Sequence, residues 1–169
     1  MGERYGVVLG ARYGDVLQWL PLMRPYCGPE NASYSDFIWA IYAVTHIVYT
    51  LNDYGVYKLS PLWLPHEFEF LKKHLHTAIN MDDPETAGEI LESLKSFGLD
   101  RRHSLIKEGE EFILSRQNAD GSWGEVGADD IYERYHPTVA AIDGLRRNAW
   151  RGLGLSIQSV RPILAPATR

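Results

Sequence analysis

The sequence predicts an all-α protein, and three features lead to that expectation. Apolar residues recur at intervals of three and four through most of the 169 residues, which is the period of an amphipathic helix. Glycine and proline divide the chain into segments of helical length. No segment alternates apolar and polar residues as a half-buried strand would. We therefore expect about six helices in a single domain over residues 1–169.

The first long helix is predicted over residues 33–55. Its apolar residues occupy nearly every side, and a helix of this kind is usually buried on most sides, so we expect it in the inner layer of the fold. Ser33 or Ser35 is available as its N-cap, and Gly55 ends it. After an extended connection, "KLSPLWLP", a helix that follows Pro65 has a narrower apolar stripe and is expected in the outer layer.

The clearest helix ends are found around "MDDPETAGEILESLKSFGLD". Asp83 is the predicted N-cap, Pro84 takes the first helical position, and Gly98 follows the last turn. The helical period continues through "HSLIKEGEEFILSRQ" and returns in "YHPTVAAIDGLRRNAW", where Pro137 is predicted to lie in the first turn. Residues 156–169 are predicted to form a tail.

Composition and charge exclude several classes of protein. The net charge is −5 and the basic residues are scattered along the sequence, so no nucleic-acid partner is expected. No stretch reaches the roughly 18 apolar residues of a membrane span. The first residues contain an apolar run too short for a secretory signal, and the single cysteine, Cys27, excludes an internal disulfide and fits a reducing compartment. We therefore expect a cytoplasmic location.

The helical pattern breaks at "QNADGSWGE", residues 117–125. Gly121 allows the left-handed backbone conformation that ends a helix. Trp123 is then expected to fold back over the helix end, while Gln117 satisfies backbone groups that have lost their helical partners. We interpret Gln117, Gly121 and Trp123 as structural residues that hold one helical hairpin against the next.

The stretch "KEGEEFILSRQNADGSWGE" resembles the QW repeat of the terpenoid cyclase and protein prenyltransferase superfamily. The matching positions are Lys107, Phe112, Ile113, Leu114, Gln117, Gly121 and Trp123. The segments on either side are similar to the helices that precede and follow such a repeat, so the resemblance covers residues 80–148. It implies helical hairpins arranged as part of an α/α toroid, with outer and inner helices around an apolar cavity.

The chain is short for a closed toroid. About three hairpins are expected from its length, and the resemblance implies about twice that number for a complete ring. The chain is therefore a fragment, a protein that associates with itself, or a smaller arc whose apolar face the N-terminal residues cover. Because soluble proteins rarely leave a large apolar patch exposed, we expect a homo-oligomer.

The resemblance also implies an acid site, which the sequence matches only in part. Cyclases of this kind use an Asp-x-Asp-Asp motif, in which neighbouring carboxylates and an apolar cavity keep one carboxylic acid protonated. The nearest stretch is Asn80-Met81-Asp82-Asp83, which lacks the first aspartate. Asp82 and Asp83 are the candidates for that acid, and a capping role for Asp83 is the alternative.

A zinc site is the second feature that the resemblance implies. Tyr135-His136 lies where such prenyltransferases have a Tyr-His pair that supplies one zinc ligand, but no Asp-x-Cys motif for the other ligands is present. His136 alone would be a poor metal centre. We therefore expect no metal and no cofactor.

The residues themselves suggest a binding site around His46 and Asp53. The two lie seven positions apart in the most apolar helix, so they share one face at a separation of roughly 10 Å along the axis. With Tyr135 and His136 they are expected to line a polar spot in an apolar chamber, as ligand pockets do. The alternative is that His46 is a core histidine with its hydrogen bonds satisfied and that Asp53 caps the turn after its helix.

Two functions from different classes follow from these observations. In the first, the protein is a non-catalytic helical module that binds an apolar ligand or a protein partner. In the second, it is a cyclase-like or prenyltransferase-like enzyme, or half of one, that acts on an isoprenoid or another apolar substrate. The missing first aspartate, the missing Asp-x-Cys motif and the short chain favour the binding module.

Overall fold

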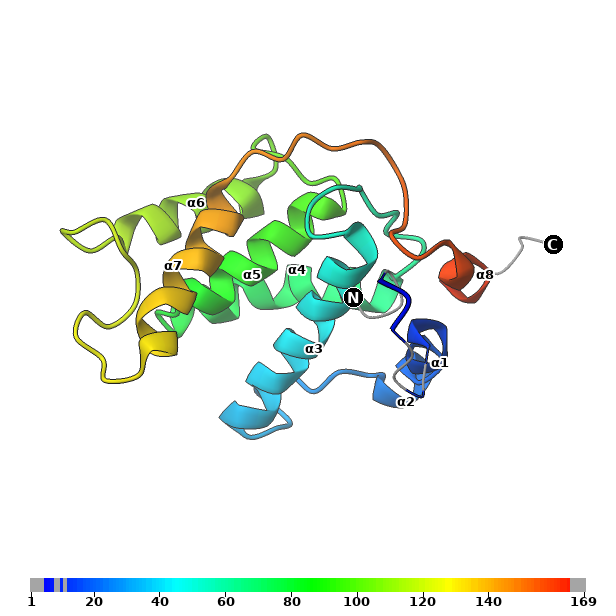
Figure 1. Ribbon diagram of the computed structural model, residues 1–169. Coiled ribbons are helices and arrows are strands. Elements are labelled where there is room, and N and C mark those ends of the chain that lie inside the picture. Colours follow the sequence, from blue (N-terminus) through cyan, green and yellow to red (C-terminus); the bar gives the residue numbers. More distant parts are fainter. Residues whose placement is uncertain (1–4, 8–9, 11, 165–169) are drawn as a thin grey trace.

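The computed structural model describes residues 5–7, 10 and 12–164, and it confirms the all-α class (Figure 1). Five helices of twelve or more residues form its body: α3 (Tyr34–Asn52), α4 (Pro65–Asn80), α5 (Pro84–Ser96), α6 (Ser104–Ser115) and α7 (Ile131–Leu145). Three shorter helices flank them: α1 (Tyr13–Leu17), α2 (Leu20–Met23) and α8 (Arg161–Leu164). The toroid stays a prediction.

The central element is α5, which packs against α3, α4, α6 and α7 (Figure 1). Its start follows the sequence pattern, because the Asp83 carboxylate accepts hydrogen bonds from the backbone amides of Glu85 and Thr86, each at 3.1 Å. Every residue from Thr86 to Ser96 is buried. The helix predicted within residues 33–55 for the inner layer, α3, is one of the four that pack around α5.

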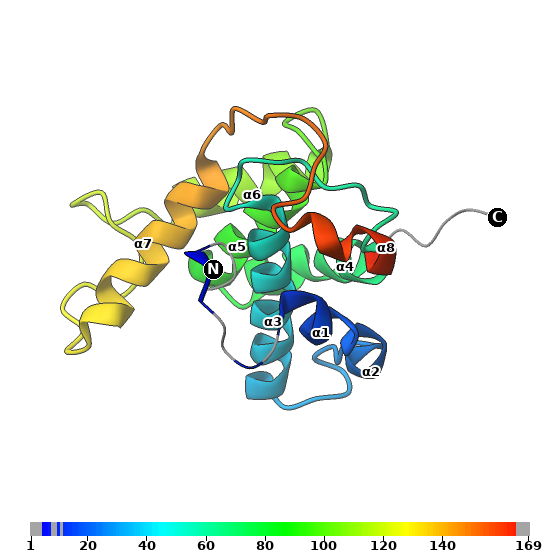
Figure 2. The same cartoon turned by 45° about the vertical axis from the view of Figure 1, so that its right-hand side comes forward.

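One side of α3 faces the core and the other borders open space. Phe37, Ile41 and Val44 are fully buried, whereas Trp39 is 67% exposed and His46 is also exposed. Figure 2 shows why, because α3 and α7 diverge from the region of α5. The apolar residues on the outer side of α3 therefore line a cleft.

Two glycines bring α5 and α7 into backbone contact. A Cβ atom at Gly88 would lie 2.4 Å from the carbonyl oxygen of Ala140, and one at Gly144 would lie 2.8 Å from the Cα of Gly88. Real Cβ atoms do not tolerate such distances, so a side chain at either position would force the helices apart. The sequence of α5 thus determines how closely α7 sits on it.

The loop between α6 and α7 is organised around Trp123, which is 4% exposed. Its indole Nε1 donates to the carbonyl oxygen of Ile113, in the last turn of α6, at 2.7 Å. Gln117 Nε2 donates to the carbonyl oxygen of Gly121 at 2.9 Å, and Gly121 has a left-handed φ of 89°. The amide of Trp123 donates to the Thr138 hydroxyl on α7 at 2.9 Å. The loop therefore ties the end of α6 to the side of α7.

The start of α7 differs from the prediction. The helix begins at Ile131, where the Asp130 carboxylate accepts from the amide of Tyr132 at 2.8 Å, and Pro137 lies inside it. Proline inside a helix leaves the carbonyl one turn earlier without its usual donor. Pro137 is buried, and its ring lies so close to Gly124 that a Cβ there would be 2.8 Å from Pro137 Cγ. Contact with the loop thus accommodates a residue that local rules place at a helix start.

The predicted tail over residues 156–169 is wrong for its first part. Residues Gln158–Val160 form a 3₁₀ turn that leads into α8, and Val160 and Leu164 are buried in the core cluster. The turn packs against α1. Residues 165–169 lie outside the described residues. Within the described part, no helix combines the length and apolar character needed to cross a membrane.

Candidate functional site

A cleft opens between α3 and α7, and α5 contributes its floor. It consists of two adjoining hollows of about 570 and 300 Å³ that share His46 and Glu89. The outer hollow is lined by Trp39, Tyr42, Ala43, His46, Glu89 and Tyr132. The inner hollow adds polar residues, among them Tyr49, Glu92, His136, Asp143 and Arg146. The cleft therefore runs from an aromatic mouth to a charged interior.

Three glutamates lie on the same side of α5, and two of them, Glu89 and Glu92, line this cleft. Glu85, Glu89 and Glu92 are spaced by four and three positions, which places them in one column. Each is held by another helix: Tyr42 donates to Glu85 Oε1 at 2.7 Å, and Thr45 donates to Glu89 Oε2 at 2.6 Å. The guanidinium of Arg146 pairs with Glu92 Oε1. The column was missed in the sequence, although its spacing on a helix with buried neighbours was a usable signal.

Glu89 is the most unusual member of the column. It is only 3% exposed, and its burial raises the pKa of the carboxyl to about 7, although the Thr45 hydrogen bond and the nearby His136 act in the opposite direction. Burial also raises the pKa of Glu92, where the Arg146 charge opposes the shift. Among the three carboxylates of the column in the described chain, only Glu89 has no basic side chain at ion-pair distance. The cleft thus contains a carboxyl group that changes charge near neutral pH.

His136 lies beside Glu85 in the second turn of α7. Its Nδ1 is 2.9 Å from Glu85 Oε1, which is an ion-pair distance, but the two atoms are not aligned for a hydrogen bond. Tyr42 already donates to the same oxygen, and the His136 ring stacks on Tyr132 with the ring centroids 4.4 Å apart. Burial, followed by the hydrogen bond to Glu85, raises the pKa of Tyr42, so its hydroxyl stays protonated and keeps donating.

His46 is exposed, so it is not the core histidine of the alternative interpretation, although backbone satisfies one of its ring nitrogens. Its Nδ1 lies 2.7 Å from the carbonyl oxygen of Tyr42, which can only accept, so Nδ1 carries a proton. The same side chain lines both hollows of the cleft. The histidine is therefore satisfied by backbone on one side of its ring and borders the cleft with the rest.

The other two residues of the expected four lie elsewhere. Asp53 is the C-cap of α3, with a left-handed φ of 58°, and Tyr135 is 50% exposed and contacts the Tyr132 ring. Neither of these two described residues lines the cleft. Residues seven apart diverge here because the helix ends at Asn52, so Asp53 no longer follows the helical face that carries His46. Of the four residues that were predicted to share one space, only His46 and His136 line the cleft.

Neither predicted acid candidate lies in the cleft. Asp83 caps α5, and Asp82 occupies the turn before it, where it pairs with Arg116 on the surface. Among the described residues, no group of three or more histidine, cysteine, aspartate or glutamate side chains is arranged to hold a metal ion. The carboxyl group best placed for acid chemistry is therefore Glu89.

Comparisons of the chain with protein-family models, with curated proteins and with solved structures found no match. The resemblance of residues 80–148 to the QW-repeat superfamily therefore stays a prediction, and the site is interpreted from its own geometry.

Proposed function

We propose that the protein is a non-catalytic binding module and that the cleft between α3 and α7 takes an apolar small molecule that carries an amine. The observation that carries this proposal is the aromatic wall of Trp39, Tyr42 and Tyr132 around the buried carboxyl of Glu89. Ligand pockets typically combine apolar walls with a few polar groups that orient the ligand. A cytoplasmic location remains part of the same proposal.

The charges of the cleft favour an amine. His136 lies at ion-pair distance from Glu85, and Arg146 pairs with Glu92, which leaves Glu89 as the carboxylate that a ligand cation would meet. A cation near Glu89 would stabilise its ionised form and lower its pKa again. The faces of Trp39 and Tyr132 add a second attraction, because aromatic rings bind ammonium groups.

A displacement assay with three matched competitors tests the proposal. The neutral fluorescent probe N-phenyl-1-naphthylamine is bound first and then displaced with decylamine, decanol or decanoate. We expect decylamine to compete best and decanoate worst, because only the amine gains a charge partner in Glu89. Competition by decylamine should strengthen as the pH rises through about 7, where Glu89 becomes charged.

Two variants and one matched control locate the binding. Trp39→Ala should weaken probe binding by about tenfold, since an aromatic wall is lost. Trp19→Ala is the control, because Trp19 is 62% exposed, comparable with the 67% of Trp39, and lies outside the cleft. Glu89→Gln should remove the preference for the amine over the alcohol. Equal effects of the two tryptophan variants, or equal competition by decanoate, would refute the assignment.

A cyclase-like enzyme is the second candidate, and Glu89 is the observation that favours it. A carboxylic acid that remains protonated near neutral pH inside an apolar cleft is suited to protonate an apolar substrate. Incubation with a linear isoprenoid alkene, followed by gas chromatography, tests this function. Conversion by the native protein that Glu89→Gln abolishes would favour the enzyme, and absence of conversion at a concentration that displaces the probe would favour the binding module.

A further inference from the structure

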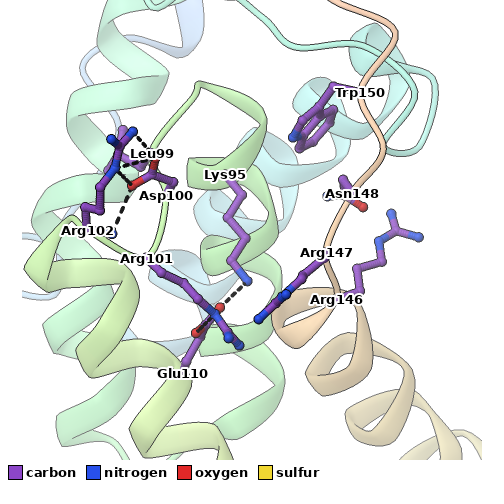
Figure 3. Close-up of a pocket in the computed structure, with 10 residues that line it drawn as sticks. All are labelled: Lys95, Leu99, Asp100, Arg101, Arg102, Glu110, Arg146, Arg147, Asn148 and Trp150. Atoms are coloured by element: carbon purple, nitrogen blue, oxygen red, sulfur yellow. Dashed lines mark hydrogen bonds and ion pairs between the residues drawn. The ribbon is translucent and has the colours of Figure 1, made fainter.

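A second pocket lies at the C-terminal end of α7 and differs from the cleft in charge. Its volume is about 360 Å³, and it is bordered by the end of α5, the turn before α6, α6 itself and the segment after α7 (Figure 3). Five of its ten lining residues are basic: Lys95, Arg101, Arg102, Arg146 and Arg147. This concentration is unexpected in a chain of net charge −5 whose basic residues are scattered in the sequence.

Two of the five cations are neutralised by carboxylates outside the centre of the pocket. Arg102 pairs with Asp100 on the exposed rim. Arg146 pairs with Glu92 and Asp143, and its guanidinium points away from Arg147 (Figure 3). The remaining charge therefore depends on Lys95, Arg101 and Arg147.

These three cations converge on a single carboxylate, that of Glu110 (Figure 3). Lys95 Nζ donates to Glu110 Oε1 at 2.7 Å, and Arg101 Nε lies 2.6 Å from Glu110 Oε2, so each carboxylate oxygen has one cation. Within the described residues, the Arg147 guanidinium has no acidic partner at ion-pair distance. The five cations therefore face four carboxylates, those of Glu110, Asp100, Glu92 and Asp143, which leaves a formal excess of one positive charge beside Arg147.

The pocket wall also contains polar atoms that lack a hydrogen-bond partner, and these atoms are donors. Arg146 Nε and Asn148 Nδ2 are buried hydrogen-bond donors with no partner among the described residues. Buried donors that lack an acceptor destabilise the folded state. Trp150 lines the upper end of the pocket, and Leu99 lies on the opposite side, beside Asp100 and Arg102 (Figure 3).

We infer that this pocket binds a small phosphate ester, with the phosphate between Arg101 and Arg147 and the organic part against Trp150. Arginine guanidinium groups bind phosphate oxygens through paired hydrogen bonds, and the indole face of Trp150 offers a stacking surface for a ring. The pocket volume suits a small ligand rather than a polymer.

Isothermal titration calorimetry with three probes tests the inference: phenyl phosphate, inorganic phosphate and benzoate. We expect phenyl phosphate to bind most tightly, inorganic phosphate less tightly and benzoate most weakly. Arg147→Ala should weaken phenyl phosphate binding by about tenfold, because one charged hydrogen-bond donor is lost. Arg134→Ala is the matched control, since Arg134 is also exposed and does not line the pocket.

Trp150→Ala tests the contribution of the ligand's ring separately from that of its phosphate. It should bring the affinity for phenyl phosphate down to that for inorganic phosphate and leave inorganic phosphate binding unchanged. Equal losses in Arg147→Ala and Arg134→Ala, benzoate binding as tight as phenyl phosphate, or no binding of phenyl phosphate at millimolar concentration would each overturn the inference. None of these variants alters Trp39 or Glu89, so the result is independent of the cleft between α3 and α7.

Discussion

The cleft between α3 and α7 and the basic pocket adjoin at Arg146 but carry opposite charges. The two glutamates that line the cleft, Glu89 and Glu92, come from one face of one helix, so their mutual spacing is a property of α5, whereas Asp143 comes from α7. The cations of the basic pocket come from α5, the turn after it and the segment after α7. The comparison shows that the spacing of these glutamates is determined by a single helix. The basic pocket, in contrast, forms only when several segments pack together.

Both sites nevertheless depend on where α7 sits. The helix supplies His136 to the cleft, and the segment that follows it supplies Arg147 to the basic pocket. Its position is set by the contact between Gly88 and Gly144 and by the Trp123 loop. Substitutions that disturb the position of α7 should therefore weaken ligand binding at both sites. A substitution of one charged group should weaken binding at only one of them.

The largest effect is expected from Trp123→Ala. Loss of this buried indole and of its hydrogen bond to Ile113 should lower the free energy of unfolding by about 3 to 5 kcal/mol. Because α7 would lose its tie to α6, both sites should bind their probes less well. Urea denaturation measures the stability, with Trp39→Ala as an exposed aromatic control. A change below about 1 kcal/mol would contradict the role given to this loop.

Glu89 should make stability depend on pH in a direction opposite to that of most carboxylates. Its pKa is higher in the folded protein, at about 7, than in the unfolded chain, so the folded state binds the proton more tightly. Its contribution is therefore complete below about pH 4.5 and is lost as the pH rises towards 7. The loss should amount to about 3 kcal/mol.

The variant Glu89→Gln isolates this contribution. The difference in free energy of unfolding between the variant and the native protein should grow from pH 5 to pH 8 in favour of the variant, as measured by urea denaturation at each pH. The basic pocket should keep its affinity for phenyl phosphate throughout. A difference that does not change with pH would show that Glu89 is ionised in the folded protein.

The next largest effect is expected for self-association. It would cover the cleft between α3 and α7 and leave the basic pocket open. Exposed apolar residues follow the outer face of α7, namely Ile131, Tyr135, Val139 and Ile142, and Val139 also lines the cleft. We expect light scattering to detect species larger than 19.2 kDa. Ile142→Glu should weaken the association by about tenfold, or about 1.4 kcal/mol.

Leu62→Glu is the matched control, because Leu62 is equally apolar, is exposed and lies far from α7 in the sequence. A monomer at all concentrations, or an equal effect of both variants, would refute the expected oligomer. In either case the basic pocket should be unaffected.

The smallest effects are expected at the two aspartates before α5. Asp83→Ala removes the N-cap and should lower the free energy of unfolding by about 1 kcal/mol. Asp82→Asn removes only a surface pair with Arg116 and should change it by less than about 0.5 kcal/mol. Thermal denaturation can resolve the two, and probe binding at both sites should remain. Loss of cleft binding in Asp82→Asn would restore that residue as a functional candidate.

The helices themselves were predictable from the sequence alone, because their signals are local. Asp83 and Pro84 mark the start of α5, Pro65 marks the start of α4, and Ser33 caps α3 by accepting from the amide of Asp36. Each signal acts within a few residues through a backbone hydrogen bond or a fixed φ, so no distant contact is needed to recognise it. The start of α7 also has a local signal, the Asp130 cap, but the prediction placed the start at Pro137, which instead lies inside the helix.

The sites were decided by packing between helices. The sequence suggested His46 and His136 as neighbours, but only the diverging axes of α3 and α7 determine that these two share a cleft while Asp53 and Tyr135 do not. The raised pKa of Glu89 follows from its burial, and Arg101 and Arg147 line one pocket only because the segment after α7 lies beside the turn before α6. Hydrophobic periodicity determines which face of a helix is buried, whereas distances between helices depend on the side chains of both partners at each contact.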